Sequence, residues 1–313
     1  MQNTYHSSVF LSKKSDKSDK LSAYMQLHFS VFLWGFTAIL GELIEMPAAI
    51  LVWWRVLITV ISLFILLRIS KSVVQDLKHH KVYFLIGVCI ALHWICFYGS
   101  IKYANASIAL ICMATSSFFT SLIEPIVVSR KLSLKEIIFG LLVLPGMYFI
   151  VDSTELDMQK GIWVGLAAAF LAALFTSYNK KYIVEGKETE ISYLELRGAL
   201  VFLSFLVPIM IFQMDISIIP STMDSFYLIV LALICTTLPF VLSMKALNKL
   251  SAFTSTLIVN LEPVYGIVLA ALLLGQHKEL DPRFYLGVIL ILAVVLLFPL
   301  VSSRNKKTNY VAE

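Results

Sequence analysis

The stretch Ser243–Gly275, SMKALNKLSAFTSTLIVNLEPVYGIVLAALLLG, decides how the whole chain folds. It begins with a short polar segment and continues as an apolar run with a Glu-Pro pair, Glu262 and Pro263, near its middle. Residues 100–126, SIKYANASIALICMATSSFFTSLIEPI, have the same layout. Both stretches begin Ser-x-Lys-x-x-Asn, and both carry Glu-Pro inside a Ser-rich apolar run. The chain therefore consists of two related halves.

The composition of the chain is that of a membrane protein. Its 313 residues are 59% hydrophobic and 14% charged, whereas an ordinary soluble domain has about 25% charged residues. The mean hydropathy is +0.85. Repeated apolar runs match the thickness of a bilayer core, and they must be helical because lipid offers no hydrogen-bond partners to the backbone. We predict an all-α integral membrane protein.

The apolar runs predict ten membrane-spanning helices, five in each half. The spans are Leu27–Leu43, Ala48–Arg68, Val82–Ile101, Ser107–Ser129, Leu134–Val151, Gly161–Tyr178, Ile191–Phe212, Phe226–Met244, Ala252–Leu274 and Phe284–Val301. The first repeat then covers residues 23–152 and the second covers residues 160–301. Residues 1–22 are polar, resemble no cleavable signal peptide and are predicted to be a disordered cytoplasmic tail. Residues 302–313 are predicted to be a second cytoplasmic tail.

Charge is distributed unequally over the predicted loops. Most Lys and Arg residues fall on the side of the N-terminus, whereas the opposite loops carry Glu45, Asp152, Glu155, Asp157, Asp215 and Asp224. By the positive-inside rule, we predict a multi-pass protein of the plasma (inner) membrane with both termini in the cytoplasm. The net charge of +5 is explained by this orientation and does not indicate nucleic acid.

The odd number of spans in each half makes the second half cross the membrane in the opposite sense to the first. Inverted repeats of this kind are typical of secondary transporters, which hold the substrate near the midplane between the repeats. We therefore predict two inverted five-helix repeats around a central cavity.

Several motifs resemble those of the drug/metabolite transporter superfamily, and most closely the EamA-type transporters, which have two EamA domains. The motifs are Trp34–Phe36 (WGF), Arg55, Arg197, Leu261–Gly266 (LEPVYG), Gly275 and Gly287. The resemblance covers roughly residues 25–301. It implies ten helices around a central cavity, cytoplasmic termini, and export or exchange of a small metabolite.

Two glutamates inside apolar runs, Glu124 and Glu262, are the main candidates for binding substrate or protons. A carboxylate in the hydrocarbon region is costly, so by default it faces the bundle interior or an aqueous cavity. Each is followed by a proline, which lacks an N–H and frees a backbone carbonyl one turn earlier. The alternative is a protonated glutamate that only fixes helix packing.

Polar and aromatic side chains complete the predicted substrate-binding set. Two of them share a helix face with Glu124 and two share a face with Glu262. The aromatic ones can stack on a cargo. His93 can relay protons, or it is an ordinary hydrogen-bonded core residue. The set consists of Trp34, His93, Trp94, Tyr98, Ser117, Thr120, Ser255 and Tyr265.

Arg55 and Arg197 lie at mirrored depths in the two halves and are candidates for gating. A guanidinium stays protonated and needs a carboxylate partner or an anionic ligand. We predict Glu42 and Glu195 as their ion-pair partners. The alternative is that each arginine extends to the lipid headgroups.

The sequence thus predicts a secondary transporter that exports or exchanges a small polar or amphipathic metabolite by alternating access. Proton coupling through Glu262 or Glu124 is a hypothesis. The alternatives are a polytopic membrane enzyme and a channel or scaffold protein. We expect no catalytic residue, no cofactor and no metal site, because the four cysteines show neither disulfide nor metal-ligand spacing and no Walker motif is present. The expected partners are a small-molecule substrate and membrane lipid, with the protein a monomer or a homodimer.

Overall fold

The computed structural model describes residues 2–71, 74, 77–152, 158–214 and 218–273, and in the last segment residues 282–283, 285–287, 289–294, 297 and 301. These residues form helices and connecting turns, with no strand among them. The helices of the first half are α1 (Gln2–Leu43), α2 (Ala48–Ile69), α3 (His80–Tyr103), α4 (Ala106–Ala114), α5 (Ser116–Val128), α6 (Leu134–Leu141) and α7 (Val143–Asp152). Those of the second half are α8 (Gln159–Tyr182), α9 (Glu188–Met214), α10 (Thr222–Ala232), the π-helical turn η3 (Leu233–Thr237), α11 (Leu238–Lys249), α12 (Ala252–Val259) and α13 (Glu262–Leu273).

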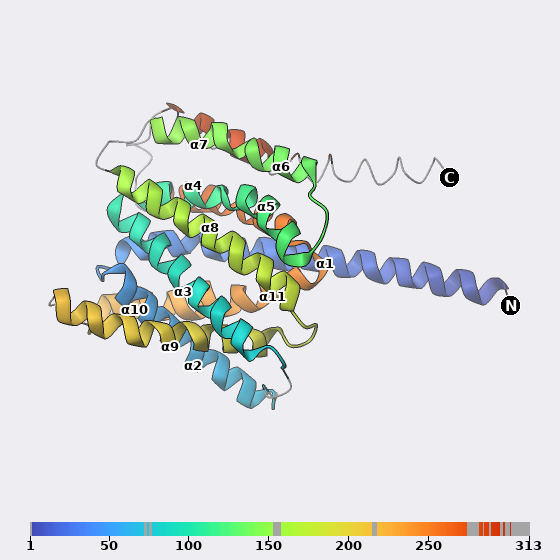
Figure 1. Cartoon of the computed structure of the whole chain (residues 1–313), viewed down its shortest axis with the longest axis horizontal. Helices are drawn as coiled ribbons and strands as arrows, with labels where there is room; N and C mark the ends of the chain where they lie inside the picture. Colours follow the sequence, from blue (N-terminus) through green and yellow to red (C-terminus); the bar gives the residue numbers. More distant parts are fainter. Residues whose placement is uncertain are drawn as a thin grey trace.

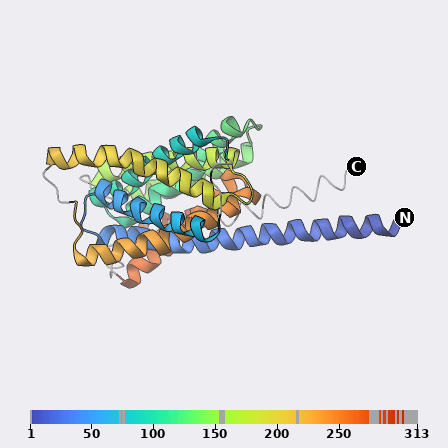
Figure 2. The ribbon, with the colours of Figure 1, turned by 90° about the horizontal axis from the view of Figure 1, so that it is seen from below.

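The helices run side by side along a common direction, as Figures 1 and 2 show. Helix α3 packs between α8 and α9, and α1 packs along α11 and α13. Each main contact therefore joins an element of the first half to one of the second. Among the large buried side chains, Tyr83 and Tyr98 pack in one core cluster with residues of α8 and α9, and Phe253 packs in a second cluster with residues of α1 and α13.

The two ends of the bundle differ in charge, and one contact identifies each end. At one end, which we call the acidic end, the Glu45 backbone N–H donates to Asp224 Oδ1 at 3.1 Å. At the other, the basic end, Lys249 Nζ lies 2.6 Å from Glu185 Oε1. Helix α1 runs toward the acidic end, whereas its counterpart α8 runs away from it. The described helices of the two halves thus run in opposite senses.

Seven helical segments are long and apolar enough to cross a membrane. They correspond to seven of the predicted spans and are Ser18–Leu43, Ala48–Ile69, His80–Tyr103, Ala106–Val128, Gln159–Tyr182, Glu188–Phe212 and Thr222–Lys249. A multi-pass membrane protein is therefore confirmed, and the number of ten spans is not established.

The other three predicted spans differ from the structure for local reasons. Leu134–Val151 is divided into α6 and α7 by a turn at Leu142. Ala252–Leu274 is divided into α12 and α13 at Asn260, ahead of a proline that removes one helical hydrogen bond. Phe284–Val301 lies only partly within the described residues, where a short apolar helix covers Tyr285–Val294.

The N-terminal segment also differs from its prediction as a disordered tail. Helix α1 begins at Gln2 and projects beyond the bundle (Figures 1 and 2). Residues 1–22 contain neither proline nor glycine, so nothing local ends the helix. The second predicted tail, residues 302–313, lies outside the described residues.

Candidate functional site

A central cavity lies between the two halves. Its wall includes residues from α1, α2, α3 and α4–α5 of the first half and from α8, α11, α12 and α13 of the second. Six predicted site residues line it: Trp34, Arg55, His93, Trp94, Ser255 and Glu262.

The cavity extends toward the basic end of the bundle. On that side its wall includes Asn179 and Leu247, which lie within one turn of the ends of α8 and α11. On the acidic side, Thr37 comes closest among the described lining residues to a helix end at that end of the bundle, and it still lies six residues before the end of α1. The cavity is therefore nearer to the basic end.

Arg55 forms the acidic-side wall of the cavity and is only 2% exposed. Its Nε donates to Thr236 Oγ1 at 2.7 Å, and its Nη1 donates to Tyr98 OH at 2.9 Å. The guanidinium carbon lies 4.1 Å from the ring centroid of Trp94. Such a stacked cation gains about 2 kcal/mol or more when it is desolvated. Arg55 is thus fixed in position by neutral groups, with part of its surface facing the cavity.

The π-helical turn η3 explains why a threonine is available to Arg55. The wider turn lets Thr236 and Thr237 donate their hydroxyls to the carbonyls five residues earlier, Leu231 and Ala232. Thr236 Oγ1 then has a lone pair for Arg55. Single π-turns inside α-helices occur frequently at functional sites. No feature of the sequence pattern indicates this turn.

Glu262 is the first residue of α13, is 6% exposed, and faces the cavity. A carboxylate is stabilised at a helix N-terminus by the helix dipole, and Thr37 of α1 lies beside it. Arg55 supplies the nearest opposite charge. The cavity wall thus contains a buried guanidinium and a buried carboxyl group, and the two come from different halves.

The broken helices of the two halves cross at the middle of the bundle. Asn260 Nδ2 donates to Ser117 Oγ at 3.0 Å, and both residues are almost completely buried. Ser117 and Asn260 occupy equivalent positions in the two repeats, because they are 143 residues apart in the sequence, as are the repeated lysines Lys102 and Lys245. Ser117, predicted to bind substrate, therefore lies at the contact between the repeats and not among the lining residues.

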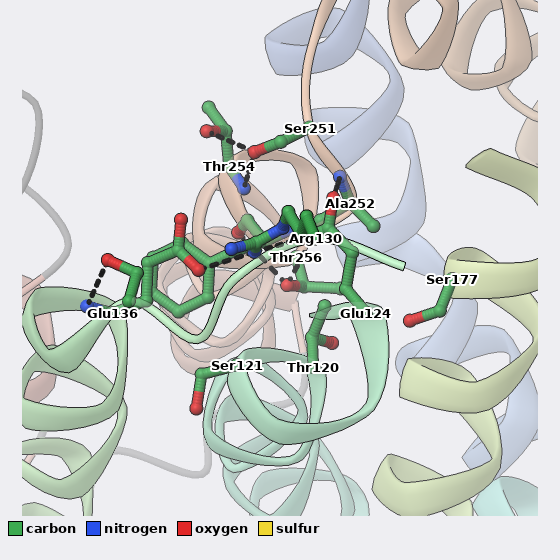
Figure 3. A network of polar contacts seen from close by, with 12 residues as sticks. Thr120, Ser121, Glu124, Arg130, Glu136, Ser177, Ser251, Ala252, Thr254 and Thr256 are labelled. Atoms are coloured by element: carbon green, nitrogen blue, oxygen red, sulfur yellow. Dashed lines mark hydrogen bonds and ion pairs between the residues drawn. The ribbon is translucent and has the colours of Figure 1, made fainter. Parts of the chain in front are cut away.

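Glu124 is placed outside the cavity wall, in contrast to the prediction, because its carboxylate caps another helix. Its Oε1 accepts the N–H of Ala252 at 3.0 Å, and its Oε2 accepts the N–H of Phe253 at 2.8 Å. Arg130 Nη2 also donates to Oε2, at 3.0 Å, and bridges to Glu136 (Figure 3). Thr120, one turn before Glu124, donates its hydroxyl within its own helix.

Arg130 reaches back to Glu124 because the chain reverses at Ser129, which has a left-handed conformation with φ of 58°. Burial of Arg130 lowers its pKa, but the hydrogen bonds to Glu136 and Glu124 outweigh burial and raise the pKa above its ordinary value. Arg130 therefore stays charged, and the cluster holds α5, the following turn and α12 together. We call Glu124, Arg130, Glu136, Ala252 and Phe253 the α12 cap.

His93 lies in the cavity wall, where one ring nitrogen, Nδ1, is 2.8 Å from the Ala168 carbonyl. Its ring packs edge-on against Phe175. This arrangement fits the hydrogen-bonded core histidine, one of the two alternatives predicted for this residue. Tyr98 lies behind the wall, bonded to Arg55, and Tyr265 packs edge-on against Phe32 away from the lining.

The predicted arginine–glutamate pairs are not the contacts that the structure forms. Arg55 bonds to neutral groups, as described above, whereas Glu42 lies near Lys102. Arg197 is exposed, with its guanidinium carbon 5.9 Å from the ring centroid of Tyr193. Glu195 is fully buried on another side of the same helix, because residues two apart point in different directions. The mirrored depths of the two arginines therefore do not give them equivalent surroundings.

Asn179 lines the cavity, and Asn260 and Thr236 form buried hydrogen bonds near it, which the sequence pattern does not reveal. Asn179 precedes two lysines and lies just beyond the end of a predicted span, and helical spacing places Asn260 on the face opposite Glu262. No group of three or more His, Cys, Asp or Glu residues able to hold a metal occurs among the described residues. The four cysteines are free thiols.

Comparison with known proteins agrees with this architecture. A solved structure titled only "Crystal structure of protein" is similar over 90% of this chain and 98% of its own, with a TM-score of 0.71 and 11% identity. That likeness shows a shared fold alone. No curated protein matches the chain. The family model of the EamA-like transporters matches residues 21–152 and 159–299, which confirms the resemblance seen in the sequence. The chain therefore belongs to the EamA-like transporter family, whose members are membrane transporters of solutes.

Proposed function

We propose that this protein is a secondary transporter that moves a small polar or amphipathic metabolite by alternating access, as an exporter or an exchanger. The observation that carries the proposal is the central cavity between two oppositely oriented halves. Such a cavity is the expected substrate site when inverted repeats rock against each other.

The cavity wall indicates the class of substrate. Most of the lining is apolar, including Leu27, Phe97 and Met244, while Arg55 and Glu262 provide one charge of each sign. A solute with an apolar body and an ionic or strongly polar group would use both kinds of surface. Arg55 would bind an anionic group, and Glu262 would bind a cationic group or a proton.

The contacts at the acidic end support a conformation that is closed there. There, Lys102 Nζ donates to the Ile44 carbonyl, and the Glu45 N–H donates to Asp224. With the basic end in the cytoplasm, as the charge distribution predicts, the cavity would be reached from the inside. Closing the basic end and breaking the acidic-end contacts would then expose the cavity to the outside.

Proton coupling is part of the proposal. Glu262 lies in the cavity wall, where it can exchange a proton with water or substrate. Replacing it with glutamine keeps its size and removes the exchangeable charge. We expect Glu262→Gln to abolish accumulation driven by a pH gradient. Unchanged gradient dependence would contradict a role for this residue in coupling.

Two experiments in sequence test the transporter function. Detergent-purified protein is first screened against a metabolite library for an increase in melting temperature, because a ligand that binds only the folded form stabilises it. The compound with the largest shift is then radiolabelled and tested in proteoliposomes preloaded with the unlabelled compound. We expect saturable counterflow. Flux that is linear in concentration would indicate a channel, and absence of flux would overturn the proposal.

A matched control separates binding from folding. Arg55→Lys keeps the positive charge but cannot make the bidentate contacts of a guanidinium. We expect it to abolish the melting shift caused by the compound, measured against the melting temperature of the same variant without compound. A compound that still stabilises this variant fully binds somewhere other than the cavity.

A further inference from the structure

Glu195 is a buried acid that the cavity does not use directly. It lies in α9 and is 0% exposed. Its Oε2 accepts a single, long hydrogen bond of 3.4 Å from Asn179 Nδ2. Its Oε1 has no hydrogen-bond partner among the described residues. A fully buried carboxylate normally needs a cation or several donors, and Glu195 has neither.

Close helix packing accounts for the complete burial of Glu195. A Cβ atom at Gly87 of α3 would clash with the Glu195 backbone carbonyl, so only glycine allows α3 to approach α9 this closely. Gly198, almost one turn further along α9, would likewise meet the Phe84 backbone at 2.9 Å. The carboxyl group is therefore enclosed between α3, α8 and α9.

The charged and titratable groups on the helices around Glu195 have other partners or face outward. From α3, Tyr83 donates its hydroxyl to the Tyr182 carbonyl at 2.9 Å. Arg55 bonds to Thr236, and Lys180 bonds to the Leu247 carbonyl. Lys249 pairs with Glu185, Lys187 pairs with Glu190, and Asn248 bonds to Glu188. Lys245 and Arg197 are exposed. No ion pair to Glu195 is formed within the described part of the chain. An ionised Glu195 would thus be an uncompensated buried charge, which is strongly unfavourable.

A proton would resolve this imbalance. Neutral Glu195 carries an O–H donor, which an ionised carboxylate lacks. The Asn179 Oδ1 atom is a second buried acceptor without a partner. The two ends of an amide side chain are interchangeable by a half-turn, so a protonated Glu195 can donate to the Asn179 oxygen. One proton therefore satisfies polar groups on two helices.

Asn179 connects this acid to the cavity. Its side chain lines the cavity wall and bonds to Glu195 behind it. We propose that Glu195 is a proton-binding site of the transporter, occupied in this conformation and loaded from the cavity past Asn179. In loading, a hydronium ion in the cavity gives its proton to Glu195 Oε2, the oxygen beside the Asn179 amide, so that an O–H bond forms and a water molecule remains. This inference rests on the proposed transport function.

Glu195 differs from Glu124 and Glu262 in its surroundings. Glu262 faces the charge of Arg55, and Glu124 has both oxygens occupied by donors. Glu195 alone of the three lacks a cation and has an unpartnered oxygen.

Infrared spectroscopy tests the protonation without a substrate. A protonated carboxyl group has a C=O stretch that is distinct from those of a carboxylate and of the amide backbone. We expect the purified parent protein at neutral pH to show this band and Glu195→Gln to lose it. Glu185→Gln, the same change at an exposed surface carboxylate, should keep the band. If the band survives in Glu195→Gln, the proton resides on another group and the proposal is overturned.

A second variant and a salt titration distinguish proton binding from misfolding and from metal binding. Glu195→Asp retains a carboxyl group and should shift the band instead of removing it, which gives a result even if the glutamine variant does not fold. Sodium chloride is titrated at constant pH and constant ionic strength, with choline chloride as the replacement. Loss of the band as sodium rises would show that the site binds a metal cation, and this outcome would also overturn the proposal.

Transport measurements distinguish failure of this inference from failure of the transport function. Counterflow of the radiolabelled compound by the parent protein needs no pH gradient and tests transport alone. Accumulation under an imposed pH gradient tests coupling, and we expect Glu195→Gln to fall to the level of protein-free liposomes. If the parent shows no counterflow, the transport function fails. If the parent shows counterflow and Glu195→Gln still accumulates the compound as the parent does, only the proton site fails.

Discussion

Removing the carboxylate of Glu124 should destabilise the protein more than any other single change at the basic end. Two of the N–H groups at the start of α12, those of Ala252 and Phe253, have this carboxylate as their acceptor. The next one, of Thr254, is accepted by Ser251. The Glu124→Ala variant therefore leaves two buried donors and one partner of Arg130 without an acceptor.

The expected magnitude follows from these contacts. A hydrogen bond to a charged group contributes about 1.5–3 kcal/mol and a helix cap about 1 kcal/mol. Breaking a fully buried ion pair costs about 3–5 kcal/mol. The Arg130 side chain is 27% exposed and keeps Glu136, so its share is discounted. We expect Glu124→Ala to lower the free energy of unfolding by about 3 kcal/mol. Glu124→Gln, which keeps one acceptor oxygen, should lower it by about half as much.

The measurement is thermal unfolding of detergent-purified protein followed by intrinsic fluorescence. For a large chain, 1 kcal/mol corresponds to about 2 °C or more, so Glu124→Ala should melt at least about 6 °C below the parent. Glu185→Gln, which breaks the exposed bridge to Lys249, serves as the control and should shift the melting temperature by less than about 2 °C. Equal melting of Glu124→Ala and the parent would refute the capping role.

Three further predictions concern helix contacts and the cavity. In a double-mutant cycle of Ser117→Ala and Asn260→Ala, we expect a coupling energy of about 0.6–1.7 kcal/mol, measured by unfolding, because the two side chains bond each other inside the membrane region; a value near zero would contradict the crossing contact. Gly87→Ala should cost at least about 1–3 kcal/mol, because its Cβ would overlap the α9 backbone, whereas Gly99→Ala, with its nearest neighbour at 3.4 Å, should melt like the parent. Arg55→Lys should slow counterflow by at least about tenfold, equivalent to about 1.4 kcal/mol, and an unchanged rate would show that the guanidinium does not contact the solute.

The fold was predictable from sequence to the extent that it depends on composition and repetition. Apolar length predicts spans, and the repeated Lys-x-x-Asn pattern predicts two halves whose order of spans is inverted. Helix breaks were less predictable. Pro263 follows the division between α12 and α13, but Pro125 lies inside α5 without ending it. A proline shows that a hydrogen bond is missing, and the packing decides whether the helix bends or ends there.

The sequence predicted a site residue correctly only where the depth of that residue within its membrane span determines what surrounds it. Glu262 and Arg55 lie in the cavity wall, as buried charges near the midplane of a transporter are expected to do. Glu124 has a similar sequence context to Glu262, but the helix opposite it begins there and offers N–H groups. Sequence periodicity gives the face of a helix and not the identity of the neighbouring helix. The roles of Glu124 and Glu195 therefore needed the tertiary structure.

The acidic-end contacts explain how a small perturbation would change the balance between the two access states. Asp224 accepts the Glu45 N–H, and Lys102 donates to the Ile44 carbonyl. The first contact joins the two halves, and the charge of Lys102 also attracts Asp224 across them, so the free energy of these interactions counts only while the acidic end is closed. A ligand or mutation shifts a two-state equilibrium by its differential free energy. Losing one charge-assisted hydrogen bond, about 1.5–3 kcal/mol, should increase the population open at the acidic end by about 10- to 100-fold.

The population that is open at the acidic end can be measured by labelling a residue in the cavity wall. Ser255→Cys places a thiol in the cavity wall, and a membrane-impermeant thiol reagent added at the acidic side reaches it only when that end is open. We expect Asp224→Asn and Lys102→Gln each to accelerate labelling in proteoliposomes, after subtraction of labelling of the four native cysteines. Lys160→Gln removes a charge at the same end, where Lys160 forms no hydrogen bond or ion pair with any residue that the structure describes, and it should leave the rate unchanged. If both variants are labelled more slowly than the parent or at the same rate, the acidic-end contacts stabilise the fold without controlling access to the cavity.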